Sequence, residues 1–139
     1  MQIDVEINCD SELWSSFIEN AENILNDIAP RVFDKVGFSE HAKHVEISIL
    51  LTDNKSMQIL NNDYREKDKP TNVLSFPISD TEGEIFINLE TKKQEAGKFE
   101  MSFKKYIGYL VIHGALHLKG LDHGDEMDKL EDKFLKKFF

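Results

Sequence analysis

The stretch His113-Gly-Ala-Leu-His117-Leu-Lys-Gly120-Leu-Asp-His123 predicts both a core helix and a metal site. His113 and His117 are four residues apart, so on a helix they lie one turn from each other on the same face. Gly120 can end the helix and turn the chain back, which would bring His123 to a third corner. Three neutral imidazoles with an open fourth position are typical of catalytic zinc. The sequence therefore predicts one zinc ion per chain, held by these three histidines.

The same spacing occurs in the zinc-peptidase motif H-E-x-x-H-x-x-G-x-x-H, with one difference. Gly114 stands where those enzymes have the glutamate that acts as general base. A metallopeptidase is thus an alternative only if another residue supplies the base.

Around this stretch the apolar pattern predicts three helical segments in the second half of the chain. These are a piece from about Leu89 to Lys98, a long core helix from about Met101 to Lys119, and a last helix whose apolar stripe includes Met127 and Phe134.

The first half is expected to alternate strands and helices. The pattern predicts a half-buried strand at 3–7, a helix that begins at Asp10 or Ser11 and ends at Pro30, a separate helical turn around 32–36, a central strand at 45–51, and a helix that begins after Thr52 or Asp53.

Two further strands, 72–78 and 84–88, flank a turn-rich segment and predict an antiparallel pair. Pro77 cannot donate to a ladder, which favours a position at the sheet edge or at a strand end. The expected fold class is α/β (α+β), with one mixed, mainly four-stranded sheet packed by helices. The metal site would lie on the long core helix and the turn after it.

Composition predicts one domain, residues 1–139, of a globular protein. Cys9 is the only cysteine, which excludes a disulfide framework and a thiolate zinc site. No signal peptide or membrane span is recognisable, so a cytoplasmic location is expected. The net charge of −9 argues against a general nucleic-acid binder, because phosphate contacts need basic side chains.

A second unusual stretch is Tyr64-Arg65-Glu-Lys67-Asp-Lys-Pro-Thr-Asn-Val-Leu-Ser-Phe-Pro77, which leads from a helix into a strand. On physical grounds alone it is a solvated loop with compensating charges. If Arg65 faced a cleft, its guanidinium would be suited to negative charge on phosphorus.

Both stretches resemble the signatures of the YbeY family, bacterial endoribonucleases of rRNA maturation. Residues 113–123 match H-G-x-L-H-L-x-G-x-D-H at every fixed position, and residues 64–77 are similar to Y-R-x-K-D-x-P-T-D-V-L-S-F-P. Asn72 replaces the usual Asp of the second signature, and Glu84 replaces the Asp of a G-D-I segment. These departures leave the three histidines and Arg65 in place.

The resemblance implies a zincin-like fold, zinc on His113, His117 and His123, a catalytic and substrate-binding Arg65, and a cleft that Lys67 also borders. It further implies a single-strand-selective endoribonuclease that acts in small-subunit rRNA maturation and ribosome quality control. The partners implied are rRNA, the small ribosomal subunit and an assembly GTPase, without a membrane.

Several points stay open at this level. The attacking group can be a metal-activated water or the substrate's own 2′-OH, and no general base is assigned. Asp122 can accept from an imidazole N–H or can simply stabilise the turn. His41 and His44 are expected to be ordinary surface residues. A non-catalytic ribosome-assembly factor with a structural zinc is a further alternative.

Overall fold

A computed structural model describes residues 2–9, 15–37, 43–67, 71–90, 102–121 and 124–139. Its sheet contains four strands in the order β1-β2-β4-β3: β1 (Gln2–Cys9), β2 (His44–Thr52), β4 (Glu82–Asn88) and β3 (Val73–Ser79). β1, β2 and β4 are parallel, and β3 is antiparallel to β4. The expected α+β class and mixed four-stranded sheet are confirmed.

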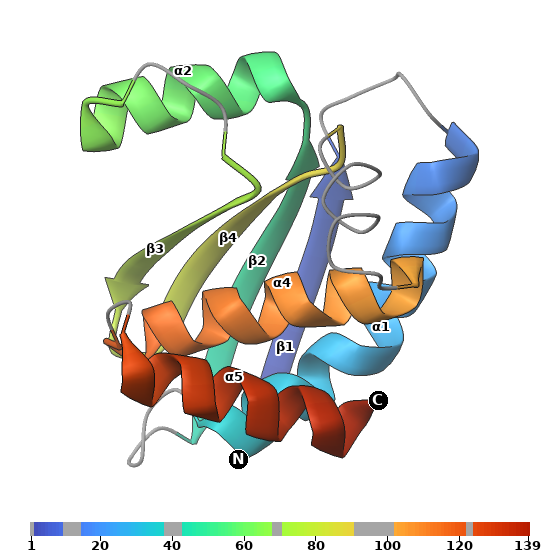
Figure 1. Cartoon of the computed structure of the whole chain (residues 1–139), viewed down its shortest axis with the longest axis vertical. Coiled ribbons are helices and arrows are strands. Elements are labelled where there is room, and N and C mark those ends of the chain that lie inside the picture. Colours follow the sequence, from blue (N-terminus) through green and yellow to red (C-terminus); the bar gives the residue numbers. More distant parts are fainter. Residues whose placement is uncertain (1, 10–14, 38–42, 68–70, 91–101, 122–123) are drawn as a thin grey trace.

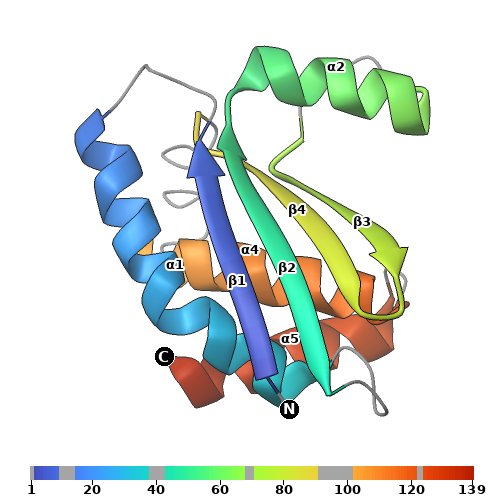
Figure 2. The same cartoon turned by 180° about the vertical axis from the view of Figure 1, so that it is seen from behind.

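Three helices cover one face of the sheet: α1 (Ser15–Val36), α4 (Phe103–Leu118) and α5 (Asp125–Phe138) (Figure 1). The opposite face is open when seen from behind, and α2 (Asn54–Arg65) lies beyond the end of the sheet where β2 finishes (Figure 2). Among the described residues, no helix has the length and apolar character needed to cross a membrane.

The strands follow the sequence pattern closely. Alternate residues of β2, from Val45 to Leu51, are buried, because this strand is central and its inner face packs on the helices. β1 alternates exposed and half-buried residues, as a strand at the sheet edge does. Pro77 lies on the other edge strand, β3, next to an irregularity of register, so the expectation for this proline is confirmed.

The prediction that a helix ends at Pro30 is wrong, because α1 continues through it to Val36. Pro30 has no N–H for the carbonyl of Asn26, and such a loss normally costs about 3 kcal/mol. Here the next turn buries Val32, Phe33 and Val36 in the core, which offsets that cost. The expected helix start at Asp10 or Ser11 lies outside the described residues.

Helix α4 is the centre of the core, as predicted. It begins after Ser102, whose side chain caps it by accepting from the Lys105 N–H, and it contacts α1, α5 and β3. Ten of its sixteen residues are buried, including Ile107, Leu110 and Val111. The two histidines near its C-terminal end are therefore carried on a tightly packed helix. The helical piece expected from Leu89 to Lys98 falls mainly on residues 91–101, outside the described part.

Candidate metal centre and cleft

His113 and His117 lie one above the other on the last turns of α4. Their ring centroids are 4.6 Å apart, and the two Nε2 atoms face each other at 3.1 Å. Both side chains are only partly buried, so their Nε2 edges border solvent-accessible space. The predicted helix spacing thus brings two ligand atoms together.

The turn after α4 fixes the ring of His117. Gly120 has a φ of 106°, which a residue with a side chain rarely adopts, and the chain reverses there. The reversal is held by the Leu121 N–H, which donates to the carbonyl of Leu116 at 3.1 Å. It also places the Leu121 carbonyl 2.9 Å from Nδ1 of His117. Because a carbonyl can only accept, this Nδ1 carries the proton.

Glu131 fixes the ring of His113 and was missed by sequence reasoning. It lies on α5, is 9% exposed, and its carboxylate contacts Nδ1 of His113. A carboxylate beside Nδ1 favours the proton on that atom. The available signal was position: Glu131 lies four residues after Met127 and three before Phe134, within the buried stripe of its helix.

The Glu131 carboxylate and the Leu121 carbonyl, which contact the two Nδ1 atoms, make the site suitable for a metal. With protons on both Nδ1 atoms, the lone pairs of both Nε2 atoms point at one another, an arrangement that a cation stabilises. Tetrahedral zinc with Zn–N bonds of about 2.05 Å places two ligand nitrogens roughly 3.3 Å apart, close to the 3.1 Å observed. His113 and His117 therefore fit a shared zinc ion. His123 and Asp122 lie outside the described residues, so the third ligand remains a prediction.

Gly114 faces the sheet, and the packing there leaves little room for a side chain. A Cβ at this position would lie 2.9 Å from Cδ1 of Ile85 and 3.2 Å from Oγ of Ser75. The Ser75 hydroxyl also donates to the Gly114 carbonyl at 3.1 Å, which ties β3 to α4. A side chain at residue 114, such as the peptidase glutamate, would therefore require Ile85 and Ser75 to move.

The two histidines open into a cleft of about 400 Å³. Arg65 and the segment 71–76, which leads into β3, line it together with His113, His117, Gly120 and Leu121. Arg65 is the last residue of α2, and Glu66 ends the helix in a left-handed conformation, with a φ of 55°. Lys67 is exposed and is not among the described residues that line the cleft. The structure therefore brings Arg65 and two of the three predicted ligands to one cleft.

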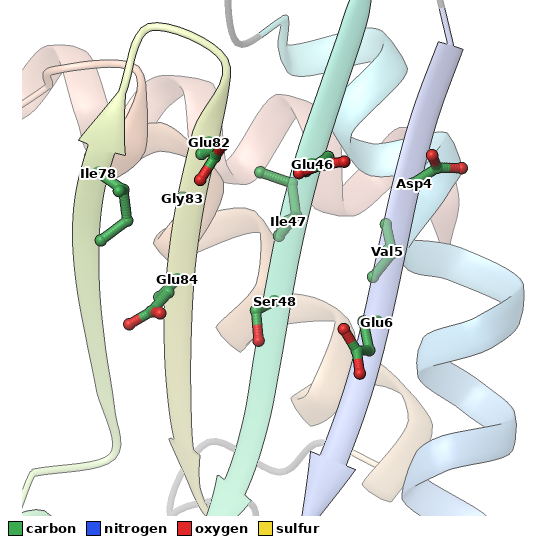
Figure 3. A pocket seen from close by; sticks show the side chains of 10 residues that line it. All are labelled: Asp4, Val5, Glu6, Glu46, Ile47, Ser48, Ile78, Glu82, Gly83 and Glu84. Carbon is green, nitrogen blue, oxygen red and sulfur yellow. The ribbon is translucent and has the colours of Figure 1, made fainter.

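His44 has partners that the sequence did not indicate. Its Nε2 lies 2.7 Å from a carboxylate oxygen of Asp4 and 3.7 Å from one of Glu46, on the open face of the sheet. These three side chains form the one group of at least three potential metal ligands among the described residues, and all three are exposed. Figure 3 shows Asp4, Glu46 and Glu82 side by side on β1, β2 and β4. This face is acidic, and its carboxylates are not among the described residues that line the cleft with Arg65.

The comparisons with known proteins show the family of this chain. The sequence model described as Endoribonuclease YbeY matches residues 8–138. The chain belongs to the YbeY family. It is 33% identical to Endoribonuclease YbeY of Fusobacterium nucleatum, over 91% of this chain and 85% of that one. It is 38% identical to the YbeY of Carboxydothermus hydrogenoformans, over 82% and 85%.

The fold also has a match among solved structures. The solution structure of TM1509 from Thermotoga maritima superposes with a TM-score of 0.60 and 28% identity, and the match covers 96% of this chain and 87% of that one. The resemblance read from the two sequence motifs is therefore confirmed. The YbeY family match, residues 8–138, spans strands β2 to β4, the four described helices and the residues of the cleft.

Glu131→Gln is expected to weaken zinc binding by roughly 10- to 100-fold, the usual effect of losing a partner that orients a ligand histidine. The amide keeps the size of the side chain but removes its negative charge, so the fold should be retained. Competition titration against a chromophoric chelator measures the affinity. The control is Asp132→Asn, which removes the charge of the exposed neighbouring residue. Equal zinc affinities of the two variants would restrict Glu131 to packing.

Proposed function

We propose that this protein is a zinc-dependent endoribonuclease that cleaves single-stranded RNA, with its physiological substrate in small-subunit rRNA. The chain belongs to a family of endoribonucleases, and its general activity is therefore cleavage of RNA phosphodiester bonds. Zinc dependence, strand selectivity and a role in ribosome quality control are the further parts of the proposal.

One observation carries the proposal: two imidazole Nε2 atoms converge in a cleft that a guanidinium also lines. Zinc held by His113 and His117, with His123 as the proposed third ligand, would supply Lewis acidity at the phosphate. Glu131 and the Leu121 carbonyl hold the two rings in the required orientation. Arg65 is proposed to offset the negative charge that develops on phosphorus, because its planar fork matches two phosphate oxygens.

The net charge of the chain supports the proposal that a larger particle presents the RNA substrate. The chain has a net charge of −9, so few counterions would be released when it binds naked RNA. We infer that the small ribosomal subunit, assisted by an assembly GTPase, supplies most of the affinity in the cytoplasm. Lys67, two residues after Arg65, is proposed to add a phosphate contact near the rim of the cleft.

The test is cleavage of a labelled oligoribonucleotide by the zinc-reconstituted full chain. We expect slow cleavage of the single strand, little cleavage of the same sequence in a duplex, and none of the DNA analogue. Activity should fall as salt is raised, because phosphate contacts are screened. Chelation should abolish cleavage, and zinc should restore it. Absence of cleavage of both the oligonucleotide and precursor small subunits would instead favour a non-catalytic assembly factor.

A further inference from the structure

Three aromatic rings form a continuous row beside the cleft. Tyr64 lies at the end of α2, Phe76 on β3 and Phe86 on β4. The Tyr64 and Phe76 rings meet edge to face, with centroids 5.1 Å apart, and Phe76 meets Phe86 in the same way at 5.6 Å. Tyr64 is 67% exposed although it is a large aromatic residue. Its ring is thus supported from one side and open to solvent on the other.

The row lines a groove on the open face of the sheet, on the other side of edge strand β3 from the helix that carries the histidines. The groove has a volume of about 160 Å³ and is lined by Leu60, Tyr64, Phe76, Ile78, Glu84 and Phe86. Phe76 lines the histidine cleft as well, so the two hollows share a wall. Arg65, which lines the cleft, directly follows Tyr64 in the chain. A single strand bound in the cleft would therefore reach the groove by passing over edge strand β3, beside Arg65 and Tyr64.

The chemistry of the groove selects a nucleobase and not a phosphate. Its lining is aromatic and aliphatic, and its one ionisable group among the described residues, other than the Tyr64 hydroxyl, is the carboxylate of Glu84. A carboxylate repels phosphate but can accept a hydrogen bond from a base amino group. Aromatic rings stack on unpaired bases without regard to sequence. The acidic hollow that contains Asp4, Glu46 and Glu82 adjoins the groove at Ile78 and Glu84, so an RNA strand that continued across the open sheet face would be repelled.

We propose that Tyr64, supported by Phe76, is a stacking subsite for an unpaired base next to the phosphate that Arg65 contacts. The proposal rests on the proposed function and adds a physical basis for its strand selectivity. A base held in a duplex already stacks on its neighbours and cannot lie on Tyr64. A single strand offers its bases at no such loss, so the groove favours unpaired RNA.

The test uses the full chain without added metal and a single-stranded oligoribonucleotide that carries 2-aminopurine, a fluorescent base quenched by stacking. We expect quenching with the unaltered chain and with Tyr64→Phe. Tyr64→Ala should bind roughly 5- to 150-fold more weakly and lose the quenching, given the usual strength of base–aromatic stacking. The matched control is Ile59→Ala, which trims another exposed apolar residue of the same helix outside the groove and should change neither signal.

An abasic nucleotide placed at successive positions of the RNA completes the test. At one position, loss of the base should weaken binding by the unaltered chain as much as Tyr64→Ala does. At that position, Tyr64→Ala should bind the abasic RNA no more weakly than the unaltered chain does. If the two losses simply multiply at every position, or if Tyr64→Ala binds like the unaltered chain, the proposal is overturned. A change in sedimentation with unaltered RNA binding would assign the groove to self-association, again overturning it.

Failure of the proposed function would be recognised separately. In that case no variant, including the unaltered chain with zinc, would cleave the oligonucleotide or precursor small subunits, whether or not the RNA was bound. Failure of the stacking subsite alone would leave cleavage and strand selectivity in place while Tyr64→Ala and Ile59→Ala behave alike.

Discussion

His113→Ala is expected to remove bound zinc and RNA cleavage together. Loss of a residue that only orients a ligand usually costs 10- to 100-fold in metal affinity. Removal of a ligand itself should therefore cost more than about 100-fold. Nε2 of His117 would lose the Nε2 atom that faces it, and the carboxylate of Glu131 would lose the imidazole that it contacts. Elemental analysis after reconstitution, paired with cleavage of a labelled oligoribonucleotide, measures both losses.

The matched control is His44→Ala, because His44 belongs to the other histidine-containing group, with Asp4 and Glu46. This variant should keep one zinc per chain and full cleavage. Zinc that persists in His113→Ala but is lost in His44→Ala would place the functional metal on the open face of the sheet. That result would refute the assignment to α4. Thermal unfolding of both metal-free variants checks that each retains the fold.

Arg65→Ala is expected to lower turnover by roughly 100- to 1,000-fold, the range seen when a group that stabilises transition-state charge is removed. Zinc content and thermal stability should be unchanged, because Arg65 is exposed and lies at the end of α2, whereas His113 and His117 lie on α4. The turnover of Arg65→Lys should lie between that of the unaltered chain and that of Arg65→Ala, since a lysine keeps the charge but loses the bidentate fork. Single-turnover kinetics separates this effect from a change in RNA affinity.

A suitable control for Arg65 is Lys55→Ala, which removes an exposed positive charge from the first turn of the same helix. If the two variants lowered turnover equally, the effect would be one of general charge, and the specific role of Arg65 would be refuted. Lys67→Ala should mainly raise the KM and weaken its salt dependence, because a phosphate contact at the rim adds binding and little else.

Local patterns in the sequence were sufficient for most of the fold. Burial follows a regular pattern along each of two elements. It alternates from Val45 to Leu51 in β2, and it extends around most of α4 from Phe103 to Leu118. Pro30 shows the limit of such reasoning, because whether a helix survives a proline depends on what the next turn buries. That contact is with other elements and cannot be read from the residues around Pro30.

The site divides in the same way. His113 and His117 are neighbours through helix geometry, so four-residue spacing was enough to pair them. Glu131 reaches His113 only because α5 packs against α4, and sequence reasoning looked instead to Asp122 beside the third histidine. His44 likewise gained Asp4 through the parallel register of β1 and β2, which no local pattern specifies.

The contact of Gly114 with Ile85 and Ser75 has a consequence for protein engineering. A designer who wished to turn this scaffold into a peptidase would start by writing glutamate at residue 114, the single letter that separates the two motifs. Even the Cβ of a new side chain at residue 114 would lie 2.9 Å from Cδ1 of Ile85, so Ile85 would have to shift to admit it. A smaller residue at 85 would make room for the glutamate, at the expense of core packing, because Ile85 is fully buried. The two similar histidine motifs thus differ in how closely the helix packs on the sheet, and redesign has to include the sheet.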